Sequence, residues 1–224
     1  MVRNLPLEDV VIFSQTNYLE NNDLASQDAS AENIERVSQL RFNEELLVSQ
    51  KLKNFTVKLG GLNEAQLRGW SNVIISAGGY CCDQADRIAQ EKISDLLDQY
   101  LRLDVQIFCP LGIGGHVDHL MIRDLLLARV KEGNIKAQIF FYEDLPYAGS
   151  INKEDWHAIN SLIIKYQLQS LAMPIDLVGK LELAKLYKTQ SSPYLEQYLN
   201  KRAKIVGERF HLGSFGEQIY ILNF

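Results

Sequence analysis

One stretch of the chain, Phe108–Leu127, decides the fold, and it reads Phe-Cys-Pro-Leu-Gly-Ile-Gly-Gly-His-Val-Asp-His-Leu-Met-Ile-Arg-Asp-Leu-Leu-Leu. A short, largely apolar run leads into it, Val105–Cys109, and has the length and content of a buried strand. Pro110 ends this run, and three glycines within residues 112–115 predict a loop. From Leu120 onward, apolar residues recur at helical spacing. The stretch therefore predicts a strand, a glycine loop and a helix, which together make half of a βαβ unit.

The glycine loop carries His116, Asp118 and His119. In open α/β sheets, ligands bind at the carboxyl ends of the strands, which is where this loop would lie. His116 and His119 are three positions apart, so on a helix they share one face. The three side chains are therefore candidates for a functional site.

The spacing of these residues leaves three interpretations open. Imidazoles suit zinc or a similar ion, and a nearby carboxylate can orient one of them. Gly112-x-Gly114 also resembles the start of a dinucleotide-binding loop, although Val117 takes the place of the third glycine and the next strand-end acid, Glu143, comes late. The third interpretation is a helix N-terminus with polar caps and no ligand.

Length and composition predict one α/β domain over residues 1–224, with a core large enough to fold alone. Hydrophobic residues make up 46% of the chain and charged residues 23%, as in globular proteins. A net charge of −5 gives no electrostatic case for nucleic acid, and the sequence predicts neither a signal peptide nor a membrane span. Three cysteines without a metal-binding spacing predict a reduced, cytoplasmic protein.

Apolar runs alternate with amphipathic helical patterns along the chain, which predicts a three-layer, Rossmann-like fold with a mostly parallel sheet. We expect Arg41 and Glu44 to pair on one helix face. The tail is expected to add an edge strand, Gln218–Leu222. The main expected strands cover residues 10–14, 55–59, 105–109 and 137–142, and the long helices cover residues 31–53 and 84–103.

The segment Pro110–His119, with its Gly-His-x-Asp-His core, resembles the second motif of the PIG-L / LmbE-like zinc-dependent N-deacetylases. Weaker matches follow the family's order along the chain and extend the resemblance from about Glu8 onward. These matches are Arg41-x-x-Glu44, Leu67-Arg68-Gly69, Phe141–Ala148, and Lys180 with Tyr187-x-x-Gln190.

The resemblance implies an enzyme that hydrolyses an N-acetyl group of an amino sugar or related amide with a zinc-bound water. His119 matches a metal ligand of the family. His116 matches the catalytic imidazole beside the carbonyl, and Asp118 matches the partner that orients it. The partner molecule implied is a small N-acetylated substrate such as a sugar, while the oligomeric state is not predicted.

Three further residues are candidates for binding the substrate. Arg68 follows a predicted strand and loop, and its planar guanidinium suits an anionic or hydroxyl-rich molecule. Glu143 and Asp144 end a predicted strand, a position well placed for binding in an α/β sheet. The same two acids suit the capping of the turn at Pro146, so both interpretations stay open.

The sequence departs from the family at its start. The family begins with a strand that ends in His-Pro-Asp-Asp, which supplies two of three metal ligands and the catalytic base. No histidine precedes His116 here, and one imidazole alone cannot hold catalytic zinc. The chain thus resembles the family without its first βα unit. We expect an N-terminally truncated enzyme, or alternatively a non-catalytic relative that binds a small ligand or protein partner at a vestigial site.

Overall fold

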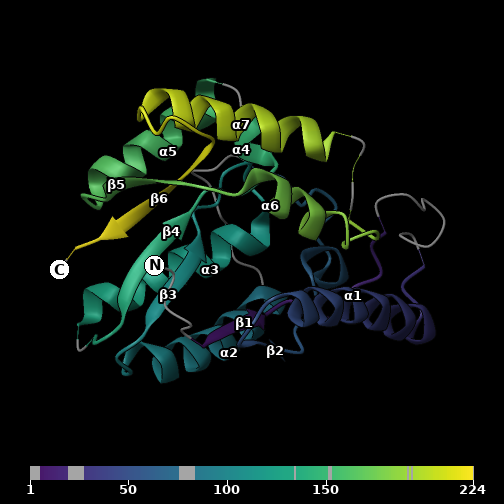
Figure 1. Cartoon of the computed structure of the whole chain (residues 1–224). Helices are drawn as coiled ribbons and strands as arrows, with labels where there is room; N and C mark the ends of the chain where they lie inside the picture. The colour runs from purple at the N-terminus through teal and green to yellow at the C-terminus, as the bar shows by residue number, and fades with distance from the viewer. Residues whose placement is uncertain are drawn as a thin grey trace. The chain divides into compact units, whose positions relative to one another are not determined.

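The computed structural model describes residues 6–19, 28–75, 84–133, 135–150, 153–190, 192 and 194–223. These residues form two compact units (Figure 1). Unit 1 comprises Met1–Trp70 and Val178–Leu195, and unit 2 comprises Ser71–Leu177 and Glu196–Phe224. The single domain over residues 1–224 stays a prediction.

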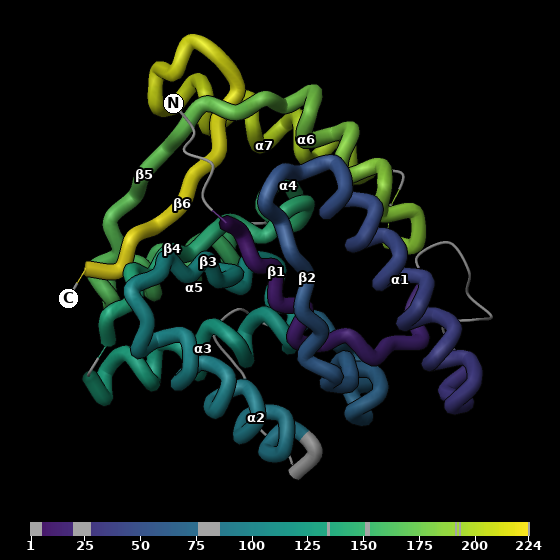
Figure 2. Tube along the Cα trace, turned by 60° about the horizontal axis from the view of Figure 1, so that its bottom comes forward, coloured from purple at the N-terminus to yellow at the C-terminus, as the bar shows by residue number. Residues whose placement is uncertain are grey.

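Unit 1 is built on a βαβ element in which two parallel strands lie side by side (Figure 2). The helix between them begins after Ser30, whose hydroxyl accepts a hydrogen bond from the Asn33 N–H. Its inner face buries Val37 and Val48. The elements of this unit are β1 (Leu7–Val11), α1 (Ala31–Lys51), β2 (Phe55–Leu59), the 3₁₀ helix η2 (Ala65–Arg68) and most of α6 (Leu177–Ala184).

The polar side chains of α1 bind segments that are distant in sequence. Glu44 accepts hydrogen bonds from the backbone N–H of Thr189, at 2.8 Å, and from its hydroxyl, at 2.6 Å. Arg41 forms an ion pair with Glu64. The expected pairing of Arg41 with Glu44 is therefore wrong, because each side chain finds a partner outside the helix.

Unit 2 contains a four-stranded sheet in the order β3-β4-β6-β5. Its strands are β3 (Gln106–Pro110), β4 (Gln138–Tyr142), β5 (Gln169–Pro174) and β6 (Gly216–Leu222). The strands β3 and β4 are parallel, as predicted, whereas β6 is antiparallel to both β4 and β5. The expected strand Gln218–Leu222 is present within β6, but its expected edge position is wrong, because β6 lies inside the sheet and β5, which was not expected, flanks it.

Helices cover both faces of this sheet. In Figure 1, α5 and α7 lie above the strands and α2 and α3 lie below them, and Figure 2 shows the same arrangement from another side. Ile139 and Phe141 of β4 are fully buried on one face, and Phe140 is 6% exposed on the other. The predicted three layers are confirmed. The helices are α2 (Gln84–Leu101), α3 (Val117–Glu132), α4 (Tyr147–Ser150), α5 (Lys153–Lys165) and α7 (Leu195–Arg209).

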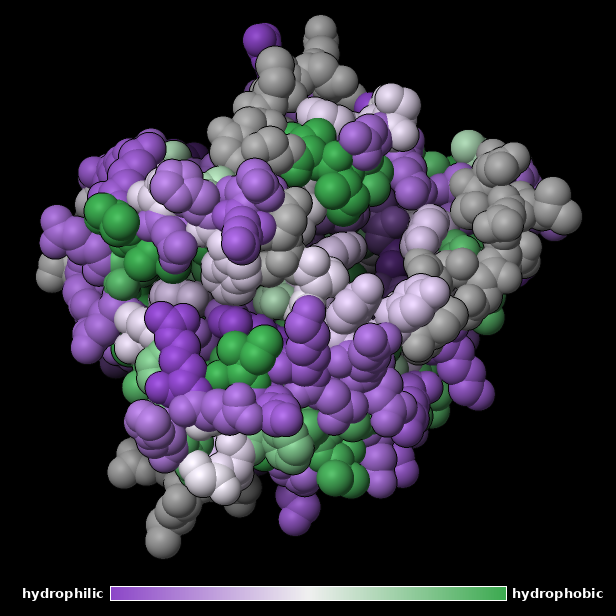
Figure 3. Space-filling view, turned by 90° about the horizontal axis from the view of Figure 1, so that it is seen from above, coloured by the Kyte–Doolittle hydropathy of each residue, from purple (hydrophilic) through white to green (hydrophobic). Residues whose placement is uncertain are grey.

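The surface is mostly hydrophilic on the face that Figure 3 shows, where the apolar residues form separate small patches. Within the part of the chain that the structure describes, no helix is both long and apolar enough to cross a bilayer.

Candidate active site

All three glycines of the loop between β3 and α3 have positive φ angles. Gly112 and Gly114 have φ angles of +81° and +87°, in the left-handed region that other residues rarely adopt. A Cβ atom on Gly114 would lie 2.6 Å from the ring atom Cγ of Tyr147. The glycines therefore let the backbone turn sharply and pack against α4.

Hydrogen bonds hold this loop in place from several sides. The Ile113 N–H donates to Oδ2 of Asp144, at 2.9 Å, and the guanidinium of Arg123 donates to the carbonyl of Leu111, at 3.1 Å. The segment Val73–Ile75 makes backbone hydrogen bonds to the residues that lead into α3. The site is thus preorganised by its scaffold rather than placed on a free loop.

His116 caps the N-terminus of α3. Its Nδ1 atom accepts a hydrogen bond from the backbone N–H of Asp118, at 3.3 Å. A neutral imidazole that accepts at Nδ1 carries its proton on Nε2, so this hydrogen bond assigns the Nε2–H tautomer. The proton of the neutral His116 imidazole therefore lies on Nε2.

His119 lies one turn along α3 and has the opposite arrangement. Its Nδ1 atom is 2.6 Å from Oδ1 of Asp144, whose side chain is fully buried and also accepts from the Ile113 N–H. A carboxylate accepts hydrogen bonds, so Nδ1 of His119 carries the proton. In the neutral imidazole Nε2 is then the acceptor atom, and 35% of the side chain is exposed.

The two imidazoles form a complementary pair. Their ring centroids are 5.1 Å apart and the rings are tilted by 43°. Nδ1 accepts a hydrogen bond in His116 and faces a carboxylate in His119, so the two neutral rings have opposite tautomers. The predicted shared face of His116 and His119 is confirmed, and so is the placement of Asp144 at the same end of the strands.

Asp118, predicted as the partner that orients His116, is buried in the first turn of α3. The hydrogen bond between the two residues runs from the Asp118 backbone N–H to the imidazole. The role of the Asp118 carboxylate stays a prediction.

Glu143 points to a different set of partners from its neighbour Asp144. Its carboxylate accepts two hydrogen bonds from the guanidinium of Arg202, one of them at 2.6 Å, and one from the Tyr220 hydroxyl, at 3.3 Å. Burial, together with the charge of Glu143, raises the pKa of Tyr220 well above its usual value and keeps the hydroxyl a donor. Substrate binding by either acid stays a prediction.

Arg68, the remaining predicted binding residue, belongs to unit 1. It donates to the carbonyl of Asn63, at 2.7 Å, and its guanidinium lies 4.8 Å from the ring centroid of Phe13. Only 8% of the residue is exposed. Its predicted place beside the histidines stays a prediction.

The residues that the structure describes do not by themselves fit a catalytic zinc ion. Such an ion takes three protein ligands, and no group of three His, Cys, Asp or Glu residues able to hold a metal occurs among the described residues. His119 offers one lone pair. Burial, and next the charge of Asp144, raises the pKa of the Cys109 thiol, which disfavours the thiolate needed for ligation. Cys81 and Cys82 lie outside the described residues.

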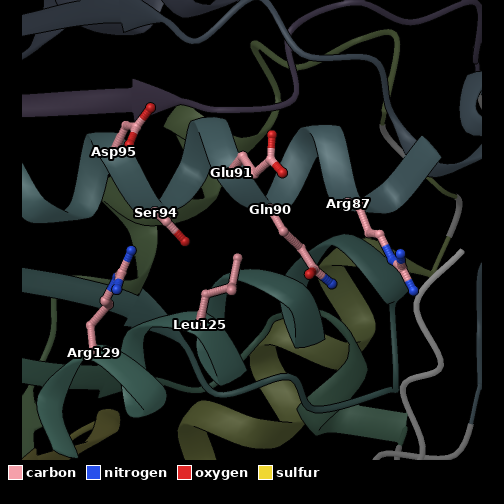
Figure 4. Close-up of a pocket in the computed structure, with 7 residues that line it drawn as sticks. All are labelled: Arg87, Gln90, Glu91, Ser94, Asp95, Leu125 and Arg129. Carbon is pink, nitrogen blue, oxygen red and sulfur yellow. The ribbon is translucent and has the colours of Figure 1, made fainter. Parts of the chain in front are cut away.

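A separate hollow lies between α2 and the C-terminal half of α3 (Figure 4). Arg87 and Ser94 of α2 and Arg129 of α3 are among its lining residues. Arg129 forms ion pairs with Asp98, at 3.3 Å, and Glu132, at 2.8 Å. None of the predicted site residues lines this hollow, so it is distinct from the histidine pair.

Arg202 is a residue of this region that was not predicted from the sequence. Arg202 lies on the buried face of α7, between Leu199 and Val206, where an apolar residue would be the usual choice. That break in the apolar pattern was a signal for a buried partner, although its identity, Glu143, depends on the tertiary fold.

No family model matches the chain. Several solved structures of deacetylases share its fold. A deacetylase–bog complex from the biosynthesis pathway of teicoplanin has a TM-score of 0.63 at 14% identity, and the match covers 96% of this chain and 85% of that one. The A40926 pseudoaglycone deacetylase Dbv21 has a TM-score of 0.60 at 15% identity, with coverages of 96% and 84%. The zinc inhibited form of teicoplanin deacetylase Orf2 has a TM-score of 0.62 at 14% identity, with coverages of 96% and 86%.

One curated protein also matches a part of the sequence. The 2′-N-acetylparomamine deacetylase of Streptomyces fradiae is 41% identical over 49 residues, which are 22% of this chain and 17% of that protein. Together with the shared fold, this match confirms the resemblance to PIG-L / LmbE-like deacetylases that the motifs indicate.

Proposed function

We propose that this chain carries one half of a deacetylase active site, in which a small N-acetylated molecule, such as an amino sugar derivative, loses its acetyl group by hydrolysis. The observation that carries the proposal is the complementary pair of His116 and His119 at the carboxyl end of β3. The shared fold supports it, as do the relatives' names, which refer to deacetylases of teicoplanin, of a pseudoaglycone and of N-acetylparomamine.

Each histidine has a role in this proposal. When water attacks an amide carbonyl, negative charge develops on the carbonyl oxygen, and an N–H donor placed there stabilises the transition state. His116 supplies such a donor at Nε2. His119 presents an unprotonated Nε2, and Asp144 fixes its tautomer and orientation, as carboxylates commonly do for metal-binding or basic histidines.

Zinc is the cofactor that the resemblance implies, and it needs more donors than the described residues supply. We propose that a preceding βα unit of the kind found in the family provides two further ligands and the catalytic base. The described residues contribute by binding and orienting the acetyl group and by holding a proton at His116 Nε2.

Metal titration beside an assay of amide hydrolysis tests the proposal. The 224-residue chain is expected to bind zinc weakly and to leave N-acetylglucosamine and N-acetylated aminoglycosides intact. A version extended with a βα unit that carries His-Pro-Asp-Asp is expected to bind zinc tightly and to release acetate. His119→Ala in the extended version should abolish both, and His116→Ala should abolish hydrolysis while leaving zinc binding. Tight zinc binding with turnover in the short chain would contradict the expected incomplete ligand set.

A non-catalytic protein that binds a small ligand or a protein partner at the same site is the second candidate. An extended version that folds and binds zinc, yet hydrolyses none of the N-acetyl sugars, would move the conclusion to this candidate.

We also propose the cytoplasm as the location. Cys109 is a free, buried thiol, which is typical of proteins from reducing compartments. Alkylation of the thiols in a fresh cell extract, followed by mass spectrometry, would test this, and a disulfide on any cysteine would contradict it.

A further inference from the structure

We infer that Arg202 is a positioning residue: it fixes Glu143 and, through the shared peptide, holds the Asp144 carboxylate where it orients His119. The consequence of this positioning role for catalysis rests on the proposed function, whereas its effect on the geometry of His119 is independent of that function.

Arg202 holds Glu143 in a defined plane. Its Nε atom is 2.6 Å from Oε2 of Glu143, and its terminal nitrogen Nη2 bonds to Oε1, so the contact is a two-point fork. Nη2 also donates to the side-chain oxygen of Gln218, at 3.3 Å. The side chains of Arg202 and Glu143 are only 8% and 3% exposed, so water cannot replace these bonds.

The guanidinium is itself held in position. It lies 4.9 Å from the ring centroid of Trp156 of α5, a stacking arrangement that a planar cation favours. Arg202 therefore links α5, α7 and the end of β4.

Fixing Glu143 also fixes the next residue. Glu143 and Asp144 follow β4 directly, and their carboxylates go to separate partners, Arg202 for the first and His119 for the second. The Asp144 carboxylate spans two partners on the glycine loop and α3, at 2.9 Å and 2.6 Å. Hydrogen bonds this short tolerate only small displacements of the Asp144 carboxylate. A shift of the peptide between Glu143 and Asp144 would therefore break one of them.

Stability alone does not explain a buried ion pair. Apolar pairs of similar volume often stabilise a core as well or better, because ions lose their hydration on burial. The two-point hydrogen bond from Arg202 fixes the orientation of Glu143. The adjacent Asp144 carboxylate must also be held in one orientation if His119 is to keep a single tautomer.

The experiment reads the tautomer of His119 by long-range ¹H–¹⁵N NMR of the histidine-labelled full chain, with resonances assigned from single His variants. The wild-type protein should show His119 as the Nδ1–H form. Asp144→Asn should remove this preference and serves as the positive control.

Arg202→Met alone leaves an unpaired buried charge and is expected to fold poorly. The informative variants are therefore the apolar double replacement Glu143→Met with Arg202→Met, and Arg202→Lys, which keeps the charge but not the fork. Both should remain folded by circular dichroism and lose the single Nδ1–H signal of His119. Arg209→Met, an exposed arginine of the same helix, should leave it unchanged.

A folded double variant with the wild-type His119 signal would overturn the inference, as would Arg202→Lys with that signal. In the extended version, Arg202→Lys should lower kcat with little change in KM. If the extended protein is inactive while the tautomer responds as described, the proposed function fails and the positioning role stands.

Discussion

Glu44 accepts both the backbone N–H and the hydroxyl of Thr189, two donors of one residue that lies 145 positions away in the sequence. The neighbouring Glu45 accepts from the Tyr187 hydroxyl, at 2.7 Å. Two consecutive glutamates of α1 thus hold the segment that follows α6, which encloses the buried carboxylate of Glu44.

Glu44→Ala should lower the free energy of unfolding by about 2–4 kcal/mol, because two hydrogen bonds to a charged group are lost. Chemical denaturation measures this change, and limited proteolysis should show faster cleavage near Thr189. Glu35→Ala, an exposed position of the same helix, is the matched control and should have little effect. Equal stability of the two variants would contradict a holding role for Glu44.

The carboxyl group of Glu45 should make unit 1 less stable as the pH rises. Burial, with a smaller contribution from Asp9, raises the pKa of Glu45 from 4.5 to about 7, although the hydrogen bond from Tyr187 opposes the shift. Between these two pH values the folded state binds more protons than the unfolded state. The contribution of Glu45 to the free energy of unfolding is therefore fully present below pH 4.5 and is lost as the pH rises to about 7.

Urea denaturation across this pH range should show a flatter profile for Glu45→Gln than for the wild type. Part of the slope remains in the variant, because burial also raises the pKa of Asp9. Profiles of the same steepness would show that Glu45 ionises normally.

Gly114→Ala should destabilise the site loop by about 2 kcal/mol through an unfavourable φ angle and a clash with Tyr147. Gly69→Ala is the control, because Gly69 has a φ angle of +96° in the left-handed region and no atom within 4 Å of an added Cβ. A larger loss of melting temperature for Gly114→Ala than for Gly69→Ala is the expected sign of the clash. A smaller loss of stability at Gly114 than at Gly69 would contradict the close packing at Gly114.

Cys109 should resist thiol reagents until the protein unfolds. Its side chain is buried, and burial raises the pKa of the thiol, so the reactive thiolate is scarce. The measurement is labelling by a chromogenic disulfide in a Cys81→Ser, Cys82→Ser background, with and without urea. Rapid labelling of the native protein would show that β3 opens locally.

Local sequence patterns predicted those strands and loops that are determined by residues close together in the sequence. The strand at residues 55–59 and the glycine loop after Cys109 are where the sequence placed them, because apolar runs, proline and glycine act locally. The strand Gln169–Pro174 was missed, since most of its residues are exposed on both faces and show no alternation. The order of strands depends on pairings between distant residues, which no local pattern encodes.

The same limit applies to the site. The spacing of His116 and His119 predicted a shared face, and the strand-end position of Asp144 predicted its proximity. The partners of Arg41 and Glu143 were not predictable, because Glu64 and Arg202 reach them only in the folded chain. Sequence periodicity thus locates a site more reliably than it identifies the residues that support it.

The position of β6 between β4 and β5 has a consequence for biosynthesis. Phe140 of β4 pairs with Ile221, and Ser170 of β5 pairs with Tyr220. Neither flanking strand can form these pairs until β6, which leaves the ribosome after both, has been synthesised. Until then, the nascent chain presents two open strand edges that are able to pair with other chains. Unit 2 therefore completes its sheet only after β6 has left the ribosome, and its yield in cells should depend on chaperones that shield those edges.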